Sequence, residues 1–368
     1  MTMTASALTV RKTYKLCSLV IFVVVLIFIS VHIGSLSSGR PRMFCSVCLI
    51  VGAIIAFKVY DWWRRLPTIE GIPSKYVLIT GCDRGFGNQL AKRLDQKGFN
   101  VIAACLTEKG EDGIRSASSE RLKTIRMDVT SDESITSAYN EVKRILPEGK
   151  GLWGLVNNAG ILGKVAMPDW LSRDDYRPDF EINTLGLIQV TTTFVPLLKK
   201  AKGRIVNMSS IAGRFTFPTS IPYSISKYGV ESFSDGARQW LRPFGVSVHM
   251  LEPGFFRTDL FETETMERRL NDMWNNLSPE IRDEYGEDWY RKFSETTLKT
   301  TREKTSTKTY RVVDCMEHAL TSVHPRPRYT VGFDAKLLFI PLSLLPAEIH
   351  DFILQLLSKA VPPKGASR

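Results

Sequence analysis

The sequence predicts an α/β protein with a doubly wound parallel sheet, N-terminal transmembrane helices and a helical C-terminal insertion. Three observations predict this fold. After Pro73, short β-rich runs alternate with stretches of helical period. Two long apolar segments precede them, and residues 260–312 are charged and helix-patterned. With 368 residues, 43% of them hydrophobic, the chain can form a sizeable core.

Two apolar segments occupy residues 16–36 and 43–60, inside an N-terminal membrane anchor that we place at residues 1–66. The first has no charged side chain and is long enough to cross ~30 Å of hydrocarbon as a helix. The second carries only Lys58 and is followed by two tryptophans and two arginines, as is typical of a membrane interface. A cleaved signal peptide is the alternative for the first segment, but a second apolar segment follows it.

The net charge of +11 lies mostly beside these segments, because residues 1–75 contain nine basic and two acidic side chains. This distribution favours a lipid bilayer as partner and argues against nucleic acid. Basic side chains at the outer ends of the two helices outnumber Arg40 and Arg42 in the turn between them. We therefore expect the endoplasmic reticulum membrane, with the catalytic domain on the cytosolic face. The six cysteines have no framework spacing, which indicates a reduced protein.

Six strands are predicted in a domain that we place at residues 75–335. They are Tyr76–Thr80, Val101–Cys105, Lys123–Met127, Leu152–Val156, Arg204–Met208 and Val246–Leu251. Segments of helical period lie between them, so we expect helices on both faces of a parallel sheet. Residues 260–312 form the helical insertion, and residues 336–368 are an apolar segment that we expect at the membrane.

A glycine-rich turn follows the first strand and leads into a helix. Glycines let the backbone turn tightly and approach a pyrophosphate, whose charge the helix N-terminus favours. A purely structural turn is the alternative, but the position after the first strand of an alternating domain favours a dinucleotide site. The expected cofactor-binding residues of this turn are Thr80, Gly81, Arg84, Gly85, Phe86 and Gly87. Those expected at the ends of the third and fourth strands are Asp128, Val129, Asn157, Ala159 and Gly160.

Tyr223 and Lys227 are four residues apart, so a helix places them on one face. Tyr139 and Lys143 have the same spacing, but only Tyr223 follows a serine, Ser210, that ends a strand. We interpret the Tyr139 pair as solvated side chains. A lysine cation within ~4 Å favours the phenolate by about 4 kcal/mol, which would let Tyr223 accept a proton from an alcohol. Ser210 can hold the substrate oxygen.

These motifs resemble those of the short-chain dehydrogenase/reductases, especially the membrane-associated retinol and hydroxysteroid dehydrogenases. The resemblance extends from the glycine turn through Pro253-Gly254 to His324–Tyr329. It implies a Rossmann-type sheet and hydride transfer between a nicotinamide cofactor and a lipophilic secondary or allylic alcohol or carbonyl, such as retinol, retinal or a hydroxysteroid. The catalytic residues that it implies are Asn183, Ser210, Tyr223 and Lys227. The further cofactor contacts are Tyr223, Lys227, Pro253, Gly254 and Thr258.

Two other functions remain open. A non-catalytic nucleotide-binding scaffold can use the same fold, although the presence of all four catalytic residues favours an enzyme. A 3-hydroxybutyrate-type dehydrogenase has similar motifs. We predict no metal site, and a homodimer is a candidate assembly. Phe255, Phe256 and residues 337–345 are candidates for the lining of an apolar substrate pocket.

The choice between NAD and NADP is predicted differently by the residues and by the resemblance. NAD-selective sites usually carry a carboxylate about 20 residues past the glycines, where this chain has the neutral Thr107. Arg84 can pair with the 2′-phosphate of NADP. Glu108 can supply the missing carboxylate, and the resemblance favours NAD. We expect NAD as the better cofactor.

Overall fold

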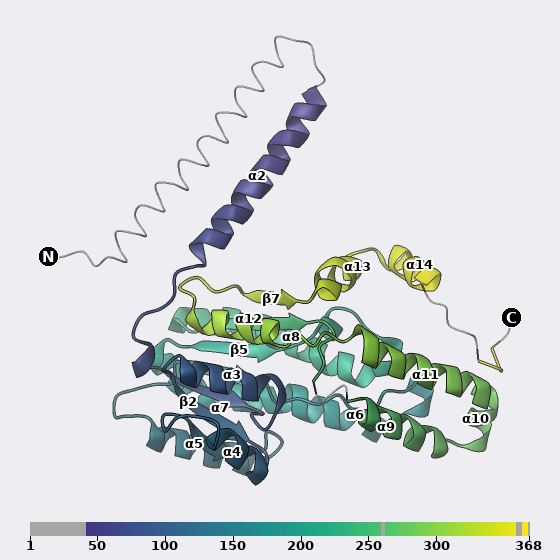
Figure 1. Cartoon of the computed structure of the whole chain (residues 1–368), viewed down its shortest axis with the longest axis horizontal. Coiled ribbons are helices and arrows are strands. Elements are labelled where there is room, and N and C mark those ends of the chain that lie inside the picture. The colour runs from purple at the N-terminus through teal and green to yellow at the C-terminus, as the bar shows by residue number, and fades with distance from the viewer. Residues whose placement is uncertain (1–41, 259–261, 358–362, 367–368) are drawn as a thin grey trace. The chain divides into compact units, whose positions relative to one another are not determined.

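The computed structural model describes residues 42–258, 262–357 and 363–366 (Figure 1). The chain divides into two units, and the larger begins at Glu70. The smaller unit contains α2 (Arg42–Arg64), where the side chains of Ile55 and Phe57 are 57% and 63% exposed. Among the described residues, no helix has the length and apolarity needed to span a membrane. Residues 16–36 lie outside the described residues, so the two-helix anchor stays a prediction.

A seven-stranded sheet forms the centre of the larger unit, and all neighbouring strands pair in parallel. The strands are β1 (Tyr76–Thr80), β2 (Asn100–Cys105), β3 (Lys123–Arg126), β4 (Gly154–Asn157), β5 (Arg204–Met208), β6 (Ser247–Pro253) and β7 (Arg328–Val331). Their order is β3-β2-β1-β4-β5-β6-β7. The direction of strand addition therefore reverses between β1 and β4, the place where open α/β sheets bind ligands. The predicted doubly wound parallel sheet is confirmed.

Helices cover both faces of this sheet. They are α3 (Gly85–Gln96), α4 (Glu108–Arg115), α5 (Asp132–Ile145), α6 (Arg173–Phe180), α7 (Gly186–Ala201), α8 (Ile221–Leu241) and α12 (Tyr310–Thr321). Leu78 of β1 belongs to a core cluster with Phe194 of α7 and Leu241 of α8. On the other face, Val77 of β1 and Leu320 of α12 both lie against Gly154 of β4. Alternate strand residues thus meet different helix layers, as the two-residue period of a strand requires.

The helical insertion consists of α9 (Thr263–Asn275), α10 (Pro279–Tyr285) and α11 (Glu287–Lys304), which lie together at one end of the sheet (Figure 1). Trp170 packs edge-on or tilted against Trp274, Tyr285 and Trp289, with ring centroids 5.1 to 5.9 Å apart. These aromatic contacts attach the insertion to the loop after β4. Residues 310–312 belong instead to α12, so the insertion ends earlier than the sequence predicted.

The C-terminal part contains the one strand of the described sheet that the sequence did not predict. β7 has only four residues, and the polar side chains of Arg328 and Thr330 alternate with buried Tyr329 and Val331. It has no continuous apolar run, which explains why it was missed. A π-helical turn (Ala335–Phe339), α13 (Ile340–Ser343) and α14 (Ala347–Leu357) follow.

Candidate active site

A cavity of about 2030 Å³ opens at the carboxyl edge of the sheet. It is lined by the glycine turn after β1, by the ends of β4, β5 and β6, and by α8 and α11. The sequence-predicted residues that line it are Gly81, Arg84, Gly85, Phe86, Asp128, Val129, Ala159, Gly160, Ser210, Tyr223, Lys227, Pro253, Gly254 and Thr258. Thr80, Gly87, Asn157 and Asn183 are described residues outside that lining.

The glycine turn places open backbone at the N-terminus of α3. Gly81 and Gly85 have φ angles of 69° and 68°, which L side chains rarely adopt. A Cβ on Gly81 would lie 2.8 Å from the Ala159 Cα, whereas a Cβ on Gly85 would meet no described atom within 4 Å. The first turn of α3 thus presents unobstructed backbone to the cavity. This arrangement fits a dinucleotide pyrophosphate.

Thr80 connects the end of β1 to the residues after β4 and so helps to position the glycine turn. Its hydroxyl oxygen accepts hydrogen bonds from the Asn158 and Ala159 N–H groups, both at 3.0 Å. The Asn158 side chain donates to the main-chain oxygens of Thr80 and Gly81, at 3.0 and 3.1 Å. Thr80 therefore positions the turn, and Asn158 is the one asparagine among the residues that line the cavity.

Asn157 lies elsewhere than we predicted. Its side-chain amide donates to Thr191 and Asn207, each at 2.8 Å, and the residue is 3% exposed. Successive strand residues face opposite ways, so Asn157 points into the interior. Its expected contact with the cofactor is corrected to a structural role between β4, α7 and β5.

Asp83 is a feature of the glycine turn that sequence reasoning missed. One carboxylate oxygen accepts hydrogen bonds from the Thr107 N–H at 2.9 Å and hydroxyl at 2.7 Å; the other accepts from the Leu106 N–H at 2.8 Å. A carboxylate is therefore fixed at the end of β2 and lines the cavity. NAD-selective sites offer a carboxylate at this strand end. Asp83 was missed because it precedes the last two glycines instead of following them by about 20 residues.

Ser210, Tyr223 and Lys227 are brought together by the end of β5 and the first turns of α8. Ser210 caps a short 3₁₀ turn, and its hydroxyl oxygen accepts from the Ala212 N–H at 3.1 Å. A hydrogen bond links the Ser210 and Tyr223 side chains. The Lys227 ammonium lies 5.5 Å from the centroid of the Tyr223 ring. The predicted convergence of these three side chains is therefore present.

The electrostatics differ from our expectation for Tyr223. Burial raises the pKa of Tyr223 to about 12, and the hydrogen bond from Ser210 offsets only part of this rise. Burial also lowers the pKa of Lys227 from 10.5 to about 8. Burial of the phenol therefore opposes the lowering of the tyrosine pKa that we predicted for its lysine. Desolvation outweighs an ammonium that sits beside the ring and bonds to a strand.

Asn183 lies in a π-helical turn (Glu181–Leu185) between α6 and α7. Its side-chain oxygen accepts from the Ile161 N–H at 2.8 Å, and its amide donates to the Ile161 oxygen and the Ser226 hydroxyl, both at 3.0 Å. The side chain is thereby fully used in holding the loop after β4 against α8. It is 1% exposed and acts on the cavity through this loop.

The wall opposite the glycine turn is apolar. Phe339 packs edge-on against Phe217 and Phe255, with centroids 5.2 and 5.8 Å apart, and all three line the cavity. Phe256 also lines the cavity, as predicted. From the predicted stretch 337–345, all of which is described, only Phe339 lines the cavity. Trp289 and Phe293 of α11 complete this wall. The sequence signal for α11 was the tryptophan and tyrosine residues spaced through a helical pattern.

Tyr139 is not among the residues that line the cavity. However, it is not solvated as we predicted, because it packs edge-on against Phe194 with centroids 5.5 Å apart. Lys143 is exposed. The helix α5 lies against α7, and this contact brings the Tyr139 ring into the core.

Comparisons with known proteins agree with this architecture. Residues 75–269 match the short chain dehydrogenase family. The chain is 45% identical to mouse 17-beta-hydroxysteroid dehydrogenase type 6, over 86% of this chain and 99% of the relative. It is 46% identical to rat retinol dehydrogenase 16, over 78% of this chain and 90% of that relative.

The fold is also similar to the crystal structure of a short-chain dehydrogenase from Streptomyces avermitilis. The TM-score is 0.61 and the identity 25%, with 77% of this chain and 98% of that chain covered. The parallel sheet, the glycine turn and the Ser210–Tyr223–Lys227 group thus occur in a chain with close dehydrogenase relatives. The chain belongs to the short-chain dehydrogenase family and is an NAD(P)-dependent oxidoreductase.

Proposed function

We propose that this protein transfers a hydride between NAD and a lipophilic secondary or allylic alcohol or its carbonyl, with retinol or a hydroxysteroid as substrate. One observation carries the proposal: Ser210, Tyr223 and the glycine turn line one cavity together with Phe217, Phe255 and Phe339. The names of the mouse and rat relatives support the two substrate classes. The aromatic side chains of this cavity suit a lipophilic substrate, and threonine, lysine and glutamate side chains of α11 also line it.

Each catalytic residue receives a role from its contacts. Tyr223 exchanges the proton of the substrate hydroxyl, and Ser210, bonded to it, holds the substrate oxygen. Lys227 supplies a positive charge beneath the tyrosine ring. Asn183 keeps the loop after β4 in place through Ile161. Bound oxidised nicotinamide supplies the hydride acceptor and a positive charge that favours the phenolate.

The preference for NAD is supported by Asp83. Its carboxylate is held at the end of β2 by three hydrogen bonds and would accept from a ribose hydroxyl and repel a 2′-phosphate. Arg84 is exposed in the same turn and is the residue that would favour NADP. The proposed cofactor contacts are Gly81, Arg84, Gly85, Phe86, Asp128, Val129, Ala159, Gly160, Tyr223, Lys227, Pro253, Gly254 and Thr258. Thr80 and Gly87 support them from behind.

We further propose a membrane-bound protein of the endoplasmic reticulum with residues 1–66 as anchor and residues 75–335 as a cytosolic catalytic domain. The exposed apolar side chains of α2 support the anchor. In the C-terminal segment, Ile349, Phe352 and Leu356 of α14 lie on one helical face and are 49%, 64% and 73% exposed. This face supports membrane contact of residues 336–368.

The test is an assay of the purified full-length protein in lipid nanodiscs. All-trans-retinol and several 3- and 17-hydroxysteroids are offered with NAD or NADP, and reduced cofactor is measured. We expect turnover of at least one of these lipophilic alcohols. Dinucleotide binding without turnover of any of them would support the scaffold alternative, and turnover of 3-hydroxybutyrate alone would support a hydroxybutyrate dehydrogenase. Either result would overturn the proposal.

A further inference from the structure

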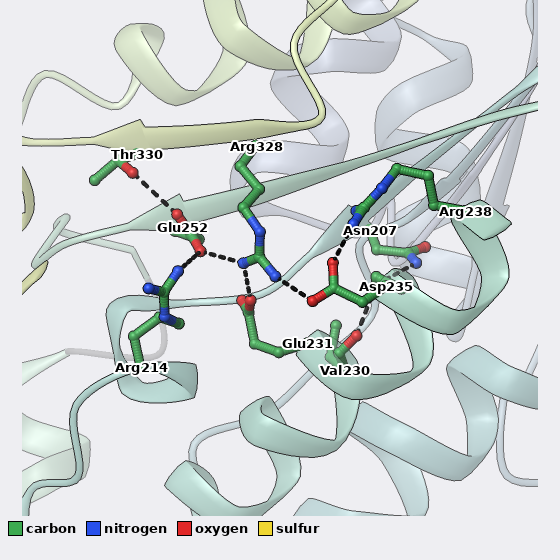
Figure 2. A network of polar contacts seen from close by, with 10 residues as sticks. Asn207, Arg214, Val230, Glu231, Asp235, Arg238, Glu252, Arg328 and Thr330 are labelled. Atoms are coloured by element: carbon green, nitrogen blue, oxygen red, sulfur yellow. Dashed lines mark hydrogen bonds and ion pairs between the residues drawn. The ribbon is translucent and has the colours of Figure 1, made fainter. Parts of the chain in front are cut away.

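Arg328 at the start of β7 contacts carboxylates from two other elements (Figure 2). Its Nη1 donates to Glu252 of β6 at 2.6 Å and also to Glu231 of α8. Its Nη2 donates to Asp235 of α8 at 2.6 Å. One guanidinium therefore joins the last described strand of the sheet to its neighbouring strand and to the helix that carries Tyr223.

Two of these carboxylates are deeply buried. Glu231 is 5% and Glu252 is 1% exposed. Glu252 also accepts from Arg214 at 3.2 Å and from the Thr330 hydroxyl at 2.9 Å, so both of its oxygens are engaged. Two buried carboxylates that share one cation repel each other strongly when the cation is removed. The ion pairs of Arg328 thus connect α8, through Glu231, to β6, through Glu252.

The network lies directly behind the active site. Glu231 follows Lys227 by one helical turn, and Glu252 immediately precedes Pro253, which lines the cavity. The packing between them is tight at Gly213, where a Cβ would lie 2.8 Å from the Glu231 Cγ and 2.9 Å from the Lys227 main-chain oxygen. A shift of Glu231 therefore cannot be absorbed by empty space and has to move α8.

We propose that Arg328 is a positioning residue that holds the Tyr223–Lys227 helix in register with the turn after β6, by pairing with Glu231 and Glu252 at the same time. The inference rests on the proposed function for its kinetic consequence only. Both α8 and the Pro253 turn line the cavity in which the substrate and cofactor would bind. Their relative placement decides whether the reacting atoms are aligned.

The charge of Glu231 makes this role testable by pH. The groups that face it are Arg328 of β7, Glu252 of β6 and Ser209 after β5, with Lys227 and Asp235 on its own helix, and Glu252 also pairs with Arg214. Burial raises the pKa of Glu231, and Glu252 raises it further, while Ser209 and Arg328 lower it. Loss of Arg328 therefore raises this pKa again. Acid then neutralises Glu231 and removes its repulsion from Glu252.

The experiment uses full-length Arg328→Gln protein in nanodiscs and measures kcat/KM for the preferred alcohol at two pH values. We expect a loss of about tenfold or more near pH 9.5, well above the pKa of about 7 that Glu231 has beside Arg328, and a clearly smaller loss near pH 6, because protonation relieves the repulsion. Adding Glu231→Gln to this variant should restore kcat/KM to within about threefold of the wild type. The second substitution removes the charge that repels Glu252, so the effects of the two substitutions are not additive. The kcat/KM of Arg328→Lys should lie between that of the wild type and that of Arg328→Gln.

Arg238→Gln is the matched control. This substitution also removes one arginine charge, here from α8, where Arg238 pairs with the half-exposed Asp235 at 2.7 Å. We expect little change in kcat/KM. An equal loss in Arg238→Gln, or a loss in Arg328→Gln that is independent of pH and of Glu231→Gln, would overturn the proposal.

A second measurement keeps the inference separate from the activity. Hydrogen exchange of α8 and β6 in the full-length protein should increase in Arg328→Gln near pH 9.5 and return toward the wild-type level near pH 6, each compared with the wild type at the same pH. The same change at both pH values would contradict the inference. If the wild type turns over none of the offered alcohols but exchange follows this pattern, the proposed function fails and the positioning role stands.

Discussion

The ammonium of Lys227 donates a hydrogen bond to the main-chain oxygen of Met208, 3.0 Å away. Met208 is the last residue of β5, two positions before Ser210. The bond therefore ties the catalytic helix to the strand end that carries the serine. It also holds the ammonium 5.5 Å from the centroid of the Tyr223 ring.

Tyr223→Phe should abolish turnover and leave dinucleotide binding nearly unchanged, because it removes the proton acceptor and little packing. The measurements are kcat with the best alcohol substrate and the Kd of the reduced cofactor from fluorescence titration. Tyr139→Phe is the control, since its ring keeps its contact with Phe194 and lies outside the cavity lining. Comparable kinetic losses in the two variants would refute the assignment of Tyr223.

Lys227→Met should abolish activity and increase the stability of the fold. Burial lowers the pKa of Lys227 from 10.5 to about 8, so the folded protein binds this proton less tightly than the unfolded chain does. Below about pH 8 the buried charge destabilises the fold, and this cost disappears as the pH rises toward 10.5. Replacing it with a methionine should add about 1–2 kcal/mol near neutral pH, after allowing for the lost bond to Met208.

Denaturant unfolding of the full-length protein in detergent, followed by tryptophan fluorescence, provides the check. The wild type should gain stability as the pH rises through the alkaline range, and the methionine variant should show a flatter dependence. A variant that is less stable than the wild type at neutral pH would contradict the role of burial in the pKa of Lys227.

Asp83→Asn should weaken the preference for NAD, because it removes the negative charge that would repel a 2′-phosphate while an amide oxygen can still accept from Thr107. The ratio of kcat/KM for NAD to that for NADP should fall by about tenfold. Arg84→Ser should change this ratio much less in the wild-type background. If the wild type instead prefers NADP by tenfold and Arg84→Ser erases that preference, NAD is the wrong choice.

Protease added to sealed microsomes should digest residues 75–368, because the basic side chains flanking the two apolar segments favour a cytosolic catalytic domain. Detection with an antibody to the C-terminal residues gives the readout. A lumenal resident protein serves as control for vesicle integrity. Full protection of residues 75–368 would mean a single span or the opposite orientation.

The sequence predicted β1 to β6 and the Ser210–Tyr223–Lys227 group well, for related physical reasons. Strands buried on both faces need continuous apolar runs, which are visible without any structure. The four-residue spacing to a lysine is common to Tyr223 and Tyr139, and the serine at the end of the preceding strand distinguished Tyr223. The family resemblance then supplied Asn183, whose contacts with Ile161 no pattern in the sequence indicates.

Other features depend on contacts between distant residues, and these were missed or placed wrongly. Asn157 and Asn158 are adjacent in sequence, and only the orientation of β4 decides which one faces the cavity. Asp83 can contribute to cofactor selection only because the fold brings the end of β2 into hydrogen-bond contact with its carboxylate. The raised pKa of Tyr223 results from burial of its side chain, and the sequence spacing between Tyr223 and Lys227 does not indicate burial.

The turn after β6 is held from the far end of the chain. Asp334 accepts a hydrogen bond from the Phe255 N–H at 2.8 Å, and a Cβ on Gly254 would collide with its carboxylate. A chain that stopped before β7 would keep the glycine turn and the Ser210–Tyr223–Lys227 group, and it would lose both this carboxylate and the strand beside β6. A premature stop codon or an exon-skipping event in the last tenth or so of the message would therefore be as damaging as a change at Tyr223. Inspection of the motifs alone would classify such a transcript as intact.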